Sequence, residues 1–194
     1  MKLEIKCFKR GEKDFPPNLY ELTDCPDKLY VLGNEKLLNE FSIAVIGARK
    51  CTLDGKRIAE QISADLAGNG VHIVSGLAYG IDCVAHQASL GQKGNAIGVL
   101  AYGIEYLYQN CRESLYQDII DSGGVIVSEY PPDTLPNKGR FHNRNRIIAA
   151  LSSGIIVVEA RDKSGSLITV DYGKKLEKDI FVVPGGVLDE NYVR

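Results

Sequence analysis

The sequence predicts an α/β fold built on a doubly wound, mostly parallel β-sheet, with an irregular N-terminal arm. Six short runs rich in Val and Ile recur along the chain, and each is apolar at successive positions instead of alternating. Such runs are typical of strands covered on both faces, as in a parallel sheet. Stretches of helical length separate them, and strands alternating with helices indicate a doubly wound fold. With 194 residues, of which 44% are hydrophobic and 25% charged, the chain can bury such a core.

The first forty residues differ from the rest. They contain three prolines, scattered aromatic residues and no sustained hydrophobic period. Proline removes a backbone donor and disrupts helices, so neither a central strand nor a long helix is expected there. We therefore expect residues 1–40 to form an arm that packs on a main domain spanning 41–194, with residues 28–33 as an edge strand.

The main domain is predicted to alternate strands and helices from its first residues. The six predicted strands cover residues 42–48, 71–76, 95–103, 124–130, 154–160 and 179–185. The five predicted helices cover residues 54–70, 80–91, 111–124, 144–154 and 166–178. The first of them spaces Ile58, Ile62 and Leu66 four residues apart and ends in glycines suited to a helix C-cap.

Charge and cysteine usage exclude several classes of protein. The formal net charge of −2 argues against a uniformly basic nucleic-acid coat but leaves room for a local basic face. The five cysteines lie far apart, so neither a disulfide framework nor a metal site is expected, and we interpret them as buried free thiols. Without a signal peptide or an apolar run of about 18 residues, the expected location is cytoplasmic, with no membrane partner.

The carboxyl ends of parallel strands are where ligands bind in such sheets, and the first of them carries Gly47, Arg49 and Lys50. A glycine turn followed by a helix start offers free N–H groups to a phosphate. The alternative is a plain turn with solvated cations. Neither a dinucleotide-binding glycine motif nor a P-loop is present.

Glycine and serine also follow the second strand, at Ser75, Gly76 and Gly80. This turn again precedes a helix and is a candidate phosphate-binding turn. Asp82 and His86 lie four residues apart on that helix, which favours a structural pair or an N-terminal cap over catalysis.

A third candidate turn follows the fifth strand and consists of Ser164, Gly165 and Ser166. A serine before an apolar helix is typical of an N-cap. The same helix start can present donors to an anion, and the two interpretations are compatible.

The most unusual segment follows the fourth strand. Residues 134–158 contain no acidic residue, and a group of cations surrounds one aromatic side chain. The group consists of Lys138, Arg140, Phe141, Arg144 and Arg146. Guanidinium groups bind phosphate in a fork, and an exposed phenylalanine stacks on an unpaired base. We interpret the segment as a single-stranded DNA site rather than a solvated loop, although one of the last two arginines can instead be buried against Glu129 or Glu159.

Taken together, these motifs resemble the DNA-processing protein A family, DprA, also called Smf. The segments that carry the resemblance are 42–55, 73–90, 127–134, 141–160, 164–169 and 182–186. It implies an extended Rossmann-like domain, with no cofactor and no enzymatic activity. The implied role is to bind and protect single-stranded DNA during natural transformation and to load the RecA recombinase, acting as a homodimer.

The resemblance also assigns DNA-contacting residues. The family's DNA-contacting arginine corresponds to Arg49, the lysine and phenylalanine before its Arg-Asn-Arg motif correspond to Lys138 and Phe141, and the motif itself matches Arg144 and Arg146. The family usually continues past the segment that matches 182–186, so the C-terminal part of the domain is expected to be missing or truncated. The family uses that part for RecA contact and for dimerisation.

A nucleotide-binding sensor or a phosphoribohydrolase-like enzyme on a related fold is the alternative. Such enzymes carry a Pro-Gly-Gly signature with a Gly-Thr pair and a catalytic glutamate. Here residues 184–186 are Pro-Gly-Gly, but no Gly-Thr follows, and no acid–base pair has a convincing spacing. A nucleotide-binding module stays open, because the glycine-rich strand ends also suit a small phosphate ligand.

Overall fold

Strands and helices alternate through most of the chain, as the sequence predicts. The computed structural model describes residues 4–109, 113–162 and 164–185. The strands in these residues are β1 (Lys6–Lys9), β2 (Lys28–Gly33), β3 (Ser42–Gly47), β4 (His72–Ser75), β5 (Ala96–Leu100), β6 (Val125–Ser128), β7 (Gly154–Glu159) and β8 (Asp179–Val182). The α-helices are α1 (Leu53–Gly68), α2 (Ile81–Ser89), α3 (Glu113–Asp121), α4 (Lys138–Leu151) and α5 (Gly165–Lys175).

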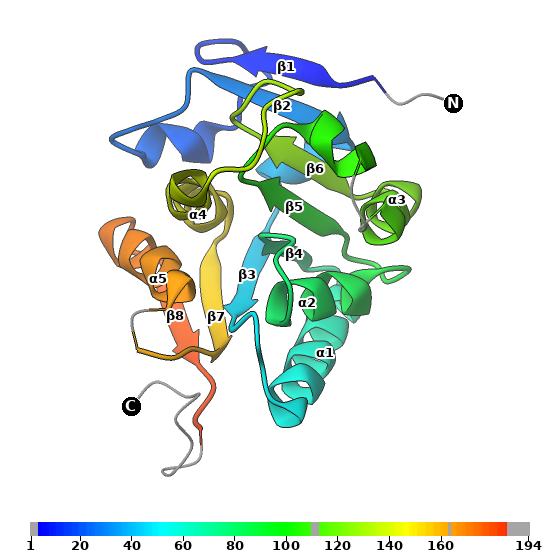
Figure 1. Cartoon of the computed structure of the whole chain (residues 1–194), viewed down its shortest axis with the longest axis vertical. Coiled ribbons are helices and arrows are strands. Elements are labelled where there is room, and N and C mark those ends of the chain that lie inside the picture. Colours follow the sequence, from blue (N-terminus) through cyan, green and yellow to red (C-terminus); the bar gives the residue numbers. More distant parts are fainter. Residues whose placement is uncertain (1–3, 110–112, 163, 186–194) are drawn as a thin grey trace.

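All of these strands lie in one sheet, in the order β1-β2-β6-β5-β4-β3-β7-β8 (Figure 1). The strands from β6 to β8 are parallel, whereas β2 pairs antiparallel with β6 and with β1. Helices α1, α2 and α3 cover one face, and α4 and α5 cover the other (Figure 1). The predicted doubly wound, mostly parallel sheet is therefore confirmed. Strand order reverses direction between β3 and β7, which makes the gap between their carboxyl ends the expected ligand site.

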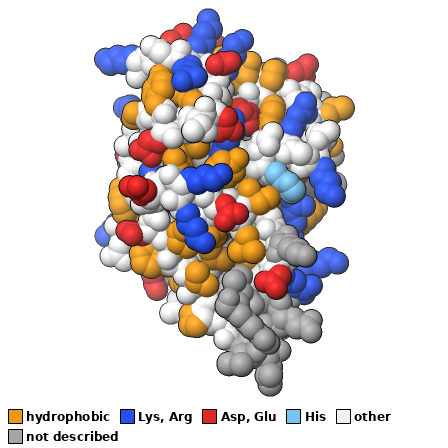
Figure 2. Space-filling view, turned by 90° about the vertical axis from the view of Figure 1, so that its left-hand side faces the viewer, with side chains coloured by type: hydrophobic (Ala, Val, Ile, Leu, Met, Phe, Trp, Pro, Cys, Tyr) orange, Lys and Arg blue, Asp and Glu red, His pale blue; other side chains and the backbone are white. Residues whose placement is uncertain are grey.

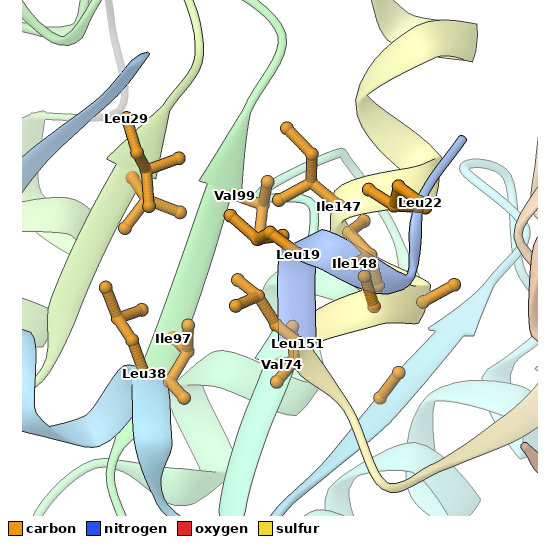
Figure 3. Close-up of a cluster of buried hydrophobic side chains, with 14 of the residues drawn as sticks. Leu19, Leu22, Leu29, Leu38, Val74, Ile97, Val99, Ile147, Ile148 and Leu151 are labelled. Atoms are coloured by element: carbon orange, nitrogen blue, oxygen red, sulfur yellow. The ribbon is translucent and has the colours of Figure 1, made fainter. Parts of the chain in front are cut away.

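The N-terminal segment contributes to both the sheet and the core. The expectation that residues 28–33 form an edge strand is wrong, because β1 pairs with the outer side of β2. The 3₁₀-helix η1 (Pro17–Glu21), with prolines at its start, places Leu19 against the buried side of α4, beside Leu22 and Ile148 (Figure 3). A second 3₁₀-helix, η2 (Glu35–Asn39), leads into β3, and a third, η3 (Ile104–Gln109), follows β5.

Helix α4 begins six residues before its predicted start at residue 144, since its first residue is 138. The side chain of Asn137 accepts a hydrogen bond from the Gly139 N–H, at 2.9 Å, and so caps the N-terminus of α4. The cationic segment is consequently helical rather than a loop, which fixes the spacing of its side chains.

Thiol burial departs from the prediction at the N-terminus. Cys25 is buried and Cys51 and Cys83 are half-buried, but Cys7 is exposed because it lies on the edge strand β1; Cys111 falls outside the described residues. The described residues contain no cluster of His, Cys, Asp or Glu able to hold a metal ion. Within the same residues, every helix is too short or too polar to cross a bilayer.

Candidate nucleic-acid interface

A cavity of about 690 Å³ opens at the carboxyl ends of β3 and β7. Its walls come from the β3–α1 turn, the β4–α2 turn, the first half of α4 and the β7–α5 turn. The cavity therefore lies at the point where the strand order reverses, the usual place for a ligand in this architecture. Its volume is in the range of sites that hold one small ligand.

An arginine stacked on a phenylalanine forms one wall of the cavity. The guanidinium carbon of Arg49 lies 5.1 Å from the ring centroid of Phe141, and Tyr102 contacts the same ring with centroids 6.2 Å apart. Phe141 is half-buried, and Lys138 is exposed one helical turn before it. Lys50 extends the cationic rim next to Arg49. The fold thus brings together the first strand end and the cationic helix, as the sequence motifs suggest.

Arg140 belongs to a different surface. Its guanidinium lies 5.0 Å from the centroid of the Tyr130 ring, and Nη1 donates to the carbonyl of Leu135. It does not line the cavity. Arg140 and Phe141 are neighbours in the sequence, but successive residues of a helix point in different directions. Arg140 therefore faces Tyr130 while Phe141 faces the cavity.

Arg144 lies beneath the cavity and is 3% exposed. Its Nη1 donates to the carbonyls of Gly76, at 2.6 Å, and Val99, and its Nε donates to Oδ1 of Asn145. Burial lowers the pKa of Arg144 to about 10, with the Asp82 carboxylate opposing the shift, so the group stays charged at neutral pH. A Cβ at position 76 would lie 2.4 Å from Nη2 of Arg144, so a larger residue there would force the Arg144 guanidinium to shift from its place.

Arg146 serves the scaffold. It is 5% exposed, and its two terminal nitrogens donate to Oε1 and Oε2 of Glu129 at 3.0 and 2.7 Å. Its Nε pairs with Oδ2 of Asp24 at 2.8 Å. Burial disfavours the charge, but Glu129 and Asp24 outweigh it and raise the pKa of Arg146. The alternative of a buried arginine paired with Glu129 is confirmed for this residue.

The turn after β4 is committed to internal contacts. Ser75 is buried and its hydroxyl donates to the Val45 carbonyl at 2.7 Å, while the Gly76 N–H donates to Oδ2 of Asp82 at 3.2 Å. Gly80 has a φ of 81°, and a Cβ there would lie 2.2 Å from the Ala48 carbonyl oxygen. None of the three residues Ser75, Gly76 and Gly80 lines the cavity, and the Ser75 hydroxyl and the Gly76 N–H are used inside the protein.

The sequence left a structural pair or an N-terminal cap open for Asp82 and His86; the two side chains form no hydrogen bond with each other, and no side chain among the described residues caps the first turn of α2. The Asp82 carboxylate instead accepts from the N–H groups of Gly76 and Ala78, which holds the turn that precedes α2. Burial raises its pKa, against the opposing charge of Arg144. His86 is fully buried, and burial lowers its pKa to about 4.

The β3–α1 and β7–α5 turns line opposite sides of the cavity. Gly47 lines it beside Arg49, and Glu159 is absent from the lining because its carboxylate accepts from the N–H and hydroxyl of Thr52. At the start of α5, the residues Ser164, Gly165 and Ser166 all line the cavity.

Sequence reasoning missed Arg161, which lines the cavity two residues after β7. The available signal was its position, since Arg49 follows β3 at the same distance. With it, the described lining contains five cations against the single carboxylate of Asp82; the cations are Arg49, Lys50, Lys138, Arg144 and Arg161.

The model of the family described as DNA recombination-mediator protein A matches residues 6–193. The chain belongs to this family. The resemblance predicted from the sequence motifs is thereby confirmed.

Individual relatives agree with the family assignment. The chain is 41% identical to DNA processing protein DprA of Streptococcus pneumoniae over 90% of its own length and 61% of that protein's length. It is 40% identical to DprA of Bacillus subtilis, over 95% and 62%, and 40% identical to protein Smf of Escherichia coli, over 89% and 46%. The chain thus spans less than two thirds of the length of these relatives.

Solved structures show the same fold. DprA from Streptococcus pneumoniae superposes with a TM-score of 0.87 at 37% identity, covering 97% of this chain and 66% of that one. A structure on the single-stranded DNA binding mode of DNA processing protein A from Helicobacter pylori gives a TM-score of 0.87 at 32% identity, covering 98% and 85%. A molybdenum cofactor carrier protein from Chlamydomonas reinhardtii, at 18% identity and a TM-score of 0.52, shares the fold alone.

Proposed function

We propose that this chain binds single-stranded DNA in the cavity between β3, β7 and α4. The observation that carries the proposal is the stacking of Arg49 on Phe141 beside the exposed Lys138, at a ligand-binding edge of the sheet. Cations attract the phosphates, and the aromatic ring offers a stacking surface to a base. The relationship to the Helicobacter pylori protein, whose structure concerns its single-stranded DNA binding mode, supports this assignment.

A preference for single-stranded over double-stranded DNA follows from the aromatic ring of Phe141. A base can stack on Phe141 only when it is unpaired, and such stacking contributes about 1–3 kcal/mol per base. Within a duplex the bases are already stacked and paired, so only the phosphate contacts remain. We therefore expect single strands to be preferred.

Surface charge supports a local site rather than a basic coat. Figure 2 shows Lys and Arg side chains interspersed with acidic and hydrophobic ones over the side of the molecule that carries α4 and α5. The net charge of −2 is consistent with this mixed surface. Binding should therefore depend on the few cavity cations.

Membership of the family supports a wider role, which we also propose. In it the chain is a non-enzymatic, cytoplasmic protein that protects incoming single-stranded DNA and loads RecA during natural transformation, and it acts as a homodimer. The cavity offers no nucleophile with a hydrogen-bonded base in its described lining, which favours binding over catalysis.

An oligo-dT titration tests the DNA-binding proposal. The Arg49→Ala/Lys138→Ala double variant should lose most of the affinity, and the slope of log K against log salt should become shallower by about one to two. Lys93→Ala/Lys174→Ala removes the same charge from exposed positions outside the cavity and should bind like the wild type. Equal affinity of the wild type and the first double variant would refute the site.

The competing enzyme function has its own readout. Release of free base or phosphate from a nucleoside monophosphate by the purified chain would support the enzyme. The same preparation, free of such turnover but binding oligo-dT, would support the proposed function.

A further inference from the structure

Tyr79 presents an aromatic ring to solvent beside the cavity. It is 66% exposed, and it lies in the turn between β4 and α2 directly after Ala78, which lines the cavity. Single exposed hydrophobic side chains are ordinary, so the position of this one is what matters. Among the exposed aromatic residues that the structure describes, Tyr79 alone is a chain neighbour of a cavity-lining residue; the others are Tyr20, Phe41 and Phe181.

The turn that carries Tyr79 is held firmly on the side that precedes it. Leu77 has a φ of 52° and a side chain buried against β5, where a Cβ on Gly98 would lie 2.7 Å from its Cδ1. Left-handed backbone is rare for leucine, and it persists only where the surrounding structure enforces it, often at ligand sites. The Asp82 carboxylate also accepts from the Ala78 N–H at 3.4 Å. Tyr79 therefore projects from a rigid turn.

The side of the turn that follows Tyr79 rests on the segment that carries Arg49. Gly80 has a φ of 81°, and a Cβ there would lie 2.6 Å from the carbonyl oxygen of Arg49. Because consecutive Cα atoms are about 3.8 Å apart, the backbone of Tyr79 lies within about 10 Å of the backbone of Arg49. The Arg49 guanidinium in turn stacks on Phe141. The fold thus places an exposed ring next to the cation and the ring already assigned to DNA.

We propose that Tyr79 is a second base-stacking surface, outside the cavity, for the nucleotide next to the one whose base lies on Phe141. The proposal rests on the proposed binding of single-stranded DNA and extends that site by one nucleotide. Proteins that bind single strands without sequence preference use aromatic side chains on which successive bases stack. Tyrosine suits an exposed position of this kind, because its hydroxyl stays in water while its ring face meets the base. The phosphate that joins the two nucleotides would lie beside Arg49 and Lys50.

Substitutions at position 79 separate stacking from general apolarity. Tyr79→Ala should weaken oligo-dT binding roughly tenfold, with the salt slope unchanged because no phosphate contact is lost. Tyr79→Phe keeps the ring face and should bind like the wild type, whereas Tyr79→Leu keeps only an apolar side chain and should lose affinity as the Ala variant does. Phe41→Ala removes a similarly exposed ring, 62% against 66%, before the amino end of β3, and should bind like the wild type.

A tryptophan probe gives a direct readout even where Tyr79→Ala does not fold. The chain contains no tryptophan, so Tyr79→Trp supplies a single indole. A base stacked on an indole quenches its fluorescence, so saturating oligo-dT should quench the emission of this variant. A strand of abasic deoxyribose phosphates carries the same charge without bases and should leave the emission unchanged. Phe41→Trp places the indole at the other end of the strands and should be quenched by neither strand.

The outcomes separate this inference from the proposed function. Wild-type affinity of Tyr79→Ala, alongside lost affinity of Arg49→Ala/Lys138→Ala, overturns the inference and leaves the proposed function intact. Unquenched emission of Tyr79→Trp at saturating oligo-dT also overturns the inference, and so does wild-type affinity of Tyr79→Leu. Failure of the wild type itself to bind oligo-dT refutes the proposed function, and this inference with it.

Discussion

The two halves of α4 carry the same kind of residue in opposite surroundings. Lys138 is exposed and Phe141 is half-buried at the cavity, whereas every residue from Arg144 to Leu151 is buried. Lys138 in the first half is exposed at the cavity, whereas Arg144 and Arg146 in the second half are held by backbone carbonyls or carboxylates. Position relative to the core, rather than charge, therefore decides what each cation does.

The largest expected effect is a loss of stability when the ion pair in the buried half of α4 is removed. Arg146→Ala leaves the carboxylate of Glu129, whose side chain is 13% exposed, without its partner, and removal of one member of a buried ion pair costs about 3–5 kcal/mol. The free energy of unfolding in urea measures this loss.

A double variant serves as the control. Arg146→Met/Glu129→Leu removes both charges and should recover most of the stability, because the remaining Asp24 is largely solvated. If the free energy of unfolding of Arg146→Ala lies within about 1 kcal/mol of the wild-type value, a structural role for Arg146 is contradicted.

The buried side chain of His86, on α2, predicts that the stability of the protein depends on pH. Burial lowers the pKa of this imidazole to about 4 in the folded protein, and the charge of Arg144 acts in the same direction. The unfolded chain binds the proton near the ordinary pKa of about 6.5, so stability is complete above that pH and is lost as the pH falls toward 4. Between pH 7.5 and 5 the loss should be roughly 2 kcal/mol.

Urea unfolding at the two pH values measures the effect, and His86→Gln provides the comparison. The glutamine side chain does not titrate in this range, so the stability of the variant should change less between the two pH values. Equal pH dependence in both proteins would assign the effect to other groups.

A smaller and purely functional effect is expected in the exposed half. Phe141→Ala should weaken oligo-dT binding by about 1–3 kcal/mol through lost stacking, with the salt slope nearly unchanged. Fluorescence anisotropy at several salt concentrations measures both quantities. A variant with a shallower slope would show that Phe141 acts by positioning the phosphate contacts instead.

The smallest effect is expected one residue earlier. Arg140→Ala removes a cation that lies on Tyr130 and outside the cavity, so oligo-dT affinity should fall by less than about threefold. The same titration compares it directly with Lys138→Ala, which removes a cavity cation. If the two variants lose equal affinity, the DNA path extends over the Tyr130 side of α4.

The sequence predicted the sheet well because its apolar runs are continuous and its helices periodic. It did not predict β1, whose four residues bury only Phe8, nor the first two turns of α4, where Gly139 and polar residues mask the helical pattern. Motif spacing suggested the meeting of Arg49 with Phe141, but it did not reveal which way each cation points. For that reason Arg140, an expected DNA contact, lies outside the cavity, whereas Arg161, which was not among the expected residues, lines it.

The Arg146 pairs have a further consequence for how the protein comes apart. They join the N-terminal segment at Asp24, the end of β6 at Glu129 and the centre of α4. The N-terminal segment cannot peel away without breaking the pair between Asp24 and Arg146, and α4 cannot shift without disturbing both partners. Opening of the arm and loss of the cavity should therefore be one cooperative event, visible as matching protection of both regions in native-state hydrogen exchange.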